Sequence, residues 1–152
     1  MTTKKNKIQA SILVAVLIAI GGGFYAYKEY NRKGNDLANS KPLFSLEATE
    51  IIKQFNNNEQ TSNQQYLSKI IEIRGQIKKI DTDSKGSNTI VLGDSSSMSS
   101  VRCSLDSLYN GSADALSVGQ TVAIKGLCTG FIADDMGIGA DVILTHCITQ
   151  KK

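Results

Sequence analysis

The sequence predicts a mainly β protein, in which a five-stranded barrel follows a short helix and an N-terminal transmembrane helix. Three observations lead to this prediction. From residue 69 onward, apolar residues recur at every second position in short runs, as in strands with one buried face. Glycine, serine, asparagine and aspartate separate these runs, as expected of turns. Residues 8–27, by contrast, contain no charged side chain.

The N-terminal part predicts a membrane anchor. Residues 1–7 are a short basic N-terminus, and residues 8–27 hold only Gln9 and Ser11 as polar side chains before the tyrosines. A helix rises ~1.5 Å per residue, so a run of about twenty residues spans the ~30 Å hydrocarbon core of a bilayer. We therefore expect a single-pass helix over residues 8–27. A slight excess of positive charge before it favours an extracytoplasmic C-terminal domain.

A cleavable signal peptide is the alternative interpretation, since lysines before an apolar run are also its signature. The run is longer than the usual h-region of ~7–15 residues. Bulky side chains, Phe24, Tyr25 and Tyr27, follow it where a peptidase requires small ones, although the glycines at 21–23 could supply a cleavage point. We expect the anchor to be retained.

Charge is distributed unevenly along the chain. Residues 1–43 hold seven basic and two acidic side chains, a net charge of +5. Residues 44–152 hold ten basic and twelve acidic side chains, a net charge of −2. The formal charge of +3 therefore comes from the membrane flanks, and the domain lacks the basic surface expected of a nucleic-acid binder.

A linker and a helix are predicted before the sheet. Residues 28–43 combine charges with turn-forming residues and the only proline, Pro42, and indicate a linker. A helix should follow, with Ser45 as its N-cap and an apolar stripe that ends at Phe55. A short turn of helix near Tyr66 then leads into the first strand.

Five strands are expected in the domain, residues 44–152. The first is long and runs from Lys69 to a turn at 81–88, and Gly75 within it predicts a bend or a close approach of another backbone. The others occupy residues 89–92, 101–105, 122–128 and 142–148, with a short helix near 113–116 and a glycine- and aspartate-rich loop over 129–141. This order of elements is the one expected of an OB-type barrel.

A pattern of mostly apolar and glycine positions extends over roughly residues 45–149. In the first half it consists of Ile51, Ile52, Phe55, Asn58, Glu59, Tyr66, Lys69, Ile71, Gly75, Ile77, Val91, Leu92, Gly93, Val101 and Cys103. In the second half it consists of Gly119, Gln120, Val122, Lys125, Gly126, Cys128, Thr129, Gly130, Phe131, Asp141, Val142, Leu144 and Cys147. With these positions the chain resembles the tRNA-anti-like family of bacterial OB-fold proteins.

The resemblance implies a fold and not an activity. Members of this family are often secreted or membrane-anchored, and no catalytic residues come with the resemblance. The segment Ala133 to Ala140 departs from the family pattern as an insertion, which puts a shared binding role of this loop in doubt.

The three cysteines are the candidate covalent site. Cys103, Cys128 and Cys147 lie on three predicted strands, and an odd number allows one disulfide between two of them, with three possible pairings. Such a bridge suits an extracytoplasmic domain, whereas three buried apolar side chains are the alternative. A zinc site is disfavoured, because no two cysteines form a C-x-x-C pair and His146 is the only histidine. We expect no metal and no cofactor.

No motif for catalysis is found. His146 has no nearby cysteine or serine motif to serve as base, so we expect an ordinary strand residue and no enzyme activity. Asn110 begins a glycosylation sequon, which carries little weight if the chain is bacterial. The candidate residues of a binding face or its loops are Arg74, Lys78, Arg102, Lys125 and Phe131.

Two classes of function remain. The first, which we favour, is a membrane-anchored extracytoplasmic binding or interaction module that holds a protein, peptide, glycan or lipid. The second is oligonucleotide binding by the barrel face, to which this fold is suited. The net charge of the domain and its scarcity of aromatic residues weigh against the second class.

Overall fold

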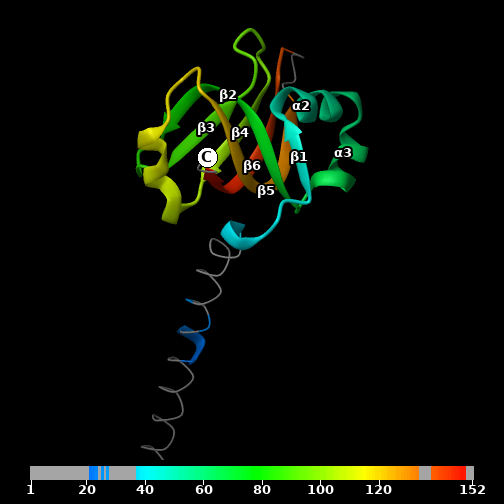
Figure 1. Ribbon diagram of the computed structural model, residues 1–152. Coiled ribbons are helices and arrows are strands. Elements are labelled where there is room, and N and C mark those ends of the chain that lie inside the picture. The colour runs from blue at the N-terminus through cyan, green and yellow to red at the C-terminus, as the bar shows by residue number, and fades with distance from the viewer. Residues whose placement is uncertain (1–20, 24, 26, 28–36, 134–137, 150–152) are drawn as a thin grey trace, which may run out of the picture. The chain divides into compact units, whose positions relative to one another are not determined.

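The computed structural model describes residues 21–23, 25, 27, 37–133 and 138–149. The chain divides into two compact units, Met1–Asn35 and Asp36–Lys152, and the elements labelled below belong to the second (Figure 1). The transmembrane span expected at 8–27 lies almost entirely outside the described residues. Among the residues that are described, none of the helices has the length and apolar character needed to cross a bilayer.

Five strands close into a barrel, as predicted. They are β2 (Ile70–Thr82), β3 (Asn88–Leu92), β4 (Ser100–Leu105), β5 (Thr121–Ala133) and β6 (Ala140–Thr149). Their order is β2-β3-β4-β6-β5, and the pairing of β2 with β5 completes the circle. Strands β4 and β6 run parallel, whereas the other four pairs in the barrel are antiparallel.

The region before β2 differs from the prediction. Ser45 is not a helix cap: it lies in a short strand, β1 (Phe44–Glu47), parallel to β2, and its hydroxyl donates to Glu72 Oε1 at 2.9 Å. Strand β1 pairs with the half of β2 that β3 does not reach. The backbone N–H and C=O groups on this edge of β2 thereby gain hydrogen-bond partners. Helix α2 (Ala48–Asn57) begins only after this strand.

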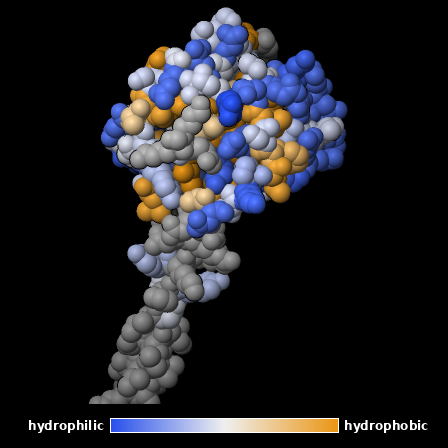
Figure 2. Space-filling model, viewed as in Figure 1, coloured by the Kyte–Doolittle hydropathy of each residue, from blue (hydrophilic) through white to orange (hydrophobic). Residues whose placement is uncertain are grey.

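A second helix, α3 (Glu59–Tyr66), extends the predicted turn of helix at Tyr66. Asn58 caps it, because its side chain accepts a hydrogen bond from the Thr61 amide at 2.9 Å. The helix is mostly polar, with Ser62 and Tyr66 as its buried residues, and its visible surface is hydrophilic (Figure 2). It therefore covers the barrel from outside with most of its residues, whereas Tyr66 at its end is part of the hydrophobic core.

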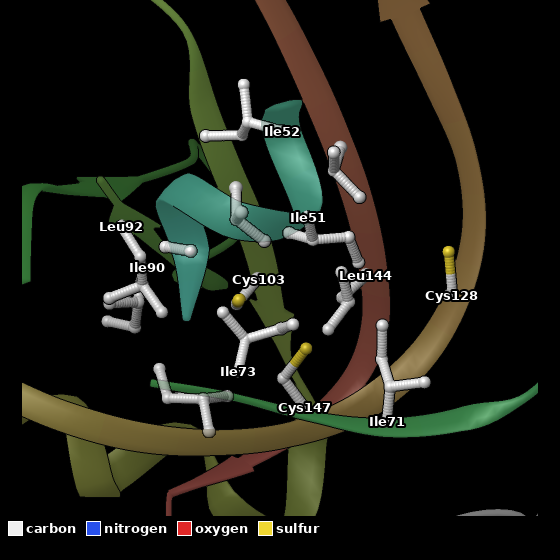
Figure 3. Close-up of a cluster of buried hydrophobic side chains, with 14 of the residues drawn as sticks. Ile51, Ile52, Ile71, Ile73, Ile90, Leu92, Cys103, Cys128, Leu144 and Cys147 are labelled. Carbon is white, nitrogen blue, oxygen red and sulfur yellow. The ribbon is translucent and has the colours of Figure 1, made fainter. Parts of the chain in front are cut away.

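Helix α2 packs its apolar stripe on the barrel core. Four of its residues are buried, namely Ala48, Ile51, Ile52 and Phe55. They meet side chains such as Ile71 and Ile73 of β2, which are 0% exposed (Figure 3). Gly75 permits this approach, since a Cβ atom built there would lie 2.8 Å from the Cβ of Ala48. The close approach predicted at this glycine is confirmed.

Two connections also differ from the prediction. The loop expected over 129–141 is shorter, because β5 continues to Ala133 and pairs there with Ala140, the first residue of β6. The helix expected near Ala113 is a longer 3₁₀ helix, η1 (Ser107–Ala115), capped by Asp106. Strand pairing extends β5, and the Asp106 cap extends η1, beyond the residues that show an apolar pattern.

Candidate ligand-binding face

The candidate site is the outward face of β3 and β4. In OB barrels the second and third strands bind ligands, together with the loop between strands one and two and the loop between strands four and five. In this chain these features are β3, β4 and the turn at 83–87, and the connection from β5 to β6 lies mostly outside the described residues. The inward residues of both strands are fully buried, so the outward side chains alone define the face.

Arg102 occupies the centre of this face. Its guanidinium lies between two carboxylates, with Nη2 3.5 Å from Asp81 Oδ2 and Nη1 3.6 Å from Asp141 Oδ2. Lys79 adds a second cation, since its Nζ lies 2.5 Å from Asp81 Oδ1. These two cations and two carboxylates balance, so the centre of the face has no net charge.

The positions beside Arg102 are apolar or carry hydroxyl groups. Val91 is the register partner of both Lys79 and Arg102, and it is 5% exposed although it faces outward. Thr89 and Ser104 face each other on β3 and β4, with their hydroxyl oxygens 3.3 Å apart. Neither strand contains an aromatic residue. The face therefore lacks the rings on which nucleic-acid bases stack.

The turn at 83–87 forms a rigid rim beside β3. Asp83 Oδ1 accepts hydrogen bonds from the Lys85 and Ser87 amides, each at 2.8 Å. The bonds from Ser87 and then Lys85 hold the pKa of the Asp83 carboxyl below its usual range. The Asn110 side chain donates to Gly86 O at 2.6 Å.

Asn110 also accepts from the Asn88 amide at 2.8 Å, so it joins η1 to the end of this turn and the start of β3. In the sequence this residue stands out only as part of a sequon. Nothing in the local pattern indicated its role, because its partners are 22 and 24 residues away.

The loop between β3 and β4 is held by Lys78. Its ammonium donates to Ser97 O at 2.6 Å, to Ser99 O at 3.1 Å and to the Ser100 hydroxyl at 3.3 Å. Ser99 in turn accepts a hydrogen bond from the Ala140 amide at 3.1 Å, which joins this loop to β6. Lys78 therefore shapes a loop and is not a freely presented cation.

The predicted binding residues do not form one site. Arg102 lies on the face, and Lys78 orders the loop beside it. Arg74 is exposed on β2 opposite Ala123, and among the described residues it has no ion-pair or side-chain hydrogen-bond partner.

The other two predicted residues have structural contacts. Lys125 is 4% exposed and bonds backbone carbonyls. Phe131 stacks on Phe55, with ring centroids 5.0 Å apart and ring planes 14° from parallel. Phe131 therefore covers the core and is not presented to a ligand.

His146 is not an ordinary strand residue, contrary to the prediction. It has a positive φ of 53° and sits where the register of β6 against β4 shifts. Its Nδ1 lies 3.0 Å from Oδ2 of Asp106, a residue that is 6% exposed. No described hydroxyl or thiol is hydrogen-bonded to this imidazole, so the pair lacks a nucleophile within the described part of the chain.

The three cysteines are buried thiols. Cys103, Cys128 and Cys147 are each 0% exposed, and the first two lie on different strands of the core (Figure 3). Burial raises the pKa of Cys128 to about 11 and the pKa of Cys147 well above its ordinary value. Such thiols stay protonated and react slowly. All three are free in this structure, and a disulfide between two of them stays a prediction.

No group of three or more histidine, cysteine, aspartate or glutamate side chains within the described ranges could hold a metal ion. The site is thus a polar protein surface framed by two ordered loops.

The strand order, the parallel pairing of β4 with β6 and the α2 helix define an OB-fold domain. The chain belongs to the tRNA_anti-like family, whose model matches residues 1–142. The family resemblance inferred from the sequence is therefore confirmed. No curated protein matches the chain.

One solved structure supports the fold. The "putative nucleic acid-binding lipoprotein" from Klebsiella pneumoniae is 20% identical, and the match covers 69% of this chain and 91% of that one with a TM-score of 0.52. A chain of the Stn1-ten1 complex from S. pombe is 21% identical, with 55% and 59% coverage and a TM-score of 0.36. At these identities the first likeness describes the fold alone, and the second is too low to support an argument.

Proposed function

We propose that this protein is a membrane-anchored, extracytoplasmic binding module that holds a protein or peptide on the β3–β4 face. The observation that carries the proposal is the position of Arg102 between Asp81 and Asp141. A charge-balanced face with hydroxyl groups at its side offers both donors and acceptors. Protein partners present the same mixture of groups, and their recognition depends on complementary charges.

Other ligand classes fit the face less well. Oligosaccharides and oligonucleotides are commonly held on aromatic side chains, and β3 and β4 have none. A lipid requires an apolar surface, whereas Lys79 and Arg102 flank the nearly buried Val91. We also propose that the domain is not an enzyme, since the buried thiols are poor nucleophiles and the His146–Asp106 pair lacks a nucleophilic partner among the described residues.

The membrane anchor rests on the sequence. The uncharged run at 8–27 supports a single-pass helix, and the basic residues before it support an extracytoplasmic domain. The Klebsiella protein of similar fold is named a lipoprotein, which agrees with an envelope location. Membrane partition and an intact mass that starts at the first residue would support the anchor. A mature chain that starts near Gly23 would contradict it.

Site-specific photo-crosslinking in intact cells tests the binding face. A photoreactive amino acid at Ser104 samples the face, and one at Thr121, exposed at the start of β5, is the matched control. We expect a discrete protein adduct from position 104 alone, and its loss in an Arg102→Ala background. Equal adducts from both positions would contradict the proposal.

Oligonucleotide binding is the second candidate, because the fold is suited to it and the Klebsiella protein carries that description in its name. The same experiment separates the two. An adduct from position 104 that nuclease removes would replace the protein-binding proposal by the oligonucleotide one.

A further inference from the structure

Residues 37–43, predicted as part of the linker, are hydrogen-bonded to β5 and to the start of β2. Leu37 is 5% exposed, and the Leu43 amide donates to Ile70 O at 2.9 Å. Between them, the carbonyls of Ala38 and Ser40 each accept a hydrogen bond from Lys125 Nζ at 2.9 Å. We call residues 37–43 the strap.

The burial of this wall is unusual for outward-facing strand positions. Lys125 and Ile148 are register partners on β5 and β6, and they are 4% and 8% exposed. Their chain neighbours Ile124 and Cys147 are 0% exposed and face the core. Because successive side chains of a strand point to opposite faces, Lys125 and Ile148 point outward. Something outside the barrel must therefore cover them, and the carbonyls of Ala38 and Ser40 do so at Lys125.

A buried ammonium group requires hydrogen-bond partners in place of the water it has lost. Lys125 is held by carbonyl oxygens, and none of the ion pairs among the described residues includes it. Its two acceptors, the carbonyls of Ala38 and Ser40, come from the strap. Separation of the strap would therefore take both acceptors away from the Lys125 ammonium, and water would have to replace them.

We propose that Lys125 is a latch that docks the strap on the β5–β6 wall and so fixes the point at which the N-terminal segment joins the barrel. In the strand order β2-β3-β4-β6-β5, β5 lies across the barrel from the β3–β4 pair. The chain thus arrives on the wall opposite the candidate binding face.

The strap also shortens the spacer between the expected anchor and the domain, a consequence that rests on the proposed function. Without docking, the spacer comprises residues 28–43, whereas with docking it comprises residues 28–36. An extended chain spans at most ~3.3–3.6 Å per residue, so the maximum reach falls from about 55 Å to about 30 Å. The latch therefore limits how far the face can stand from the membrane.

Limited proteolysis of the full chain in detergent tests the latch. A protease of broad specificity is added, and intact-mass analysis follows cuts within residues 37–43. We expect Lys125→Met to accelerate these cuts about tenfold or more while the barrel fragment stays intact, because hydrogen bonds to a charged group are lost and the strap opens locally. Leu37→Ala should act in the same direction without changing any hydrogen bond.

Lys53→Met is the matched control, because Lys53 is exposed on α2 and its side chain has no polar contact with a described residue. It should be cut as slowly as the unchanged protein. Cuts at the unchanged rate in both Lys125→Met and Leu37→Ala would overturn the latch. If Lys125→Met fails to fold, Leu37→Ala decides. The proteolysis is carried out in detergent without a membrane, so its result does not depend on whether the anchor proposal is correct.

Discussion

Two outward-facing cations on opposite walls of the barrel have different roles. Arg102, on the β3–β4 wall, keeps 41% of its side chain exposed and is paired with two carboxylates. Lys125, on the β5–β6 wall, is 4% exposed and bonds two backbone carbonyls. An exposed ion pair contributes little to stability but remains available to a ligand, whereas a buried, hydrogen-bonded ammonium holds a chain segment in place. The comparison separates a surface for binding from a surface for attachment.

Both walls depend on one core, and its disruption should have the largest effect. Ile73 is 0% exposed, so Ile73→Asp places an unpaired charge in the core and should unfold the domain. Circular dichroism and thermal melting measure this effect. The next residue, Arg74, is exposed, and Arg74→Asp should keep the fold. A folded Ile73→Asp domain would mean that the inward and outward faces of β2 are assigned wrongly.

The β5–β6 wall should tolerate added volume at one glycine and not at another. A Cβ atom at Gly126 would lie 2.5 Å from Cys147 Sγ and 3.3 Å from Leu144, whereas one at Gly130 meets nothing within 4 Å. Overpacking typically costs about 1–3 kcal/mol, which we expect for Gly126→Ala in denaturant unfolding. Gly130→Ala should change stability much less. Equal losses for the two variants would show that backbone freedom, not packing, is what these glycines supply.

The charge balance of the β3–β4 wall should limit its affinity for nucleic acid. We expect the unchanged protein to bind single-stranded DNA or RNA no more tightly than ~10⁻⁴ to 10⁻⁶ M at physiological salt, as in non-specific contact. Replacing Asp81 and Asp141 together by asparagine frees Arg102. Affinity should rise, with the salt slope steeper by about 0.7 for each added phosphate contact. Fluorescence anisotropy across a salt series measures both quantities.

Submicromolar binding by the unchanged protein, weakened by Arg102→Ala, would contradict this expectation and support the oligonucleotide function. The same double variant should unfold within about 1 kcal/mol of the unchanged protein, because exposed ion pairs contribute only ~0–1 kcal/mol. A much larger loss of stability would mean that the carboxylates have a structural role beyond Arg102.

The smallest effect concerns the rim of the binding face. The pKa of Asp83 is lowered by its hydrogen bonds to Ser87 and Lys85, so ionised Asp83 stabilises the folded turn. This contribution is present above the ordinary pKa of 3.8 and is lost as pH falls through the lower folded value. The amide resonances of Lys85 and Ser87 should therefore shift below pH 3.8, and Asp83→Asn should remove the shift. A midpoint above 3.8 would contradict the assignment.

The alternating pattern of β2, together with the order of the elements after it, was sufficient to predict the barrel. Ile71, Ile73 and Ile77 follow a period of two, and all three are buried as expected. The pattern determines which face of a strand is apolar, because that depends only on neighbouring residues. It also identified Gly75 as a point of close approach, although not the helix that approaches it.

Where the structure differs from the prediction, the cause is pairing with segments that are distant in the chain. Ser45 is a good helix cap by residue type. Its segment instead forms strand β1, because the half of β2 that β3 leaves free provides partners for backbone hydrogen bonds. His146 takes a positive φ where β6 shifts register, and Asp106, which contacts it, lies 40 residues earlier. Such partners cannot be identified within a local window of sequence.

What the sequence by itself determined is the barrel, its family and its buried residues, because strand periodicity and glycine positions are local properties. The tertiary structure alone decided the roles of the cations. Arg102 and Lys125 are both outward-facing basic residues of strands and look equivalent in the sequence. One meets Asp81 and Asp141, and the other meets carbonyls 85 and 87 residues away in the chain. The energy of a charge depends on the groups and the solvent around it, and those are set only when the chain closes on itself.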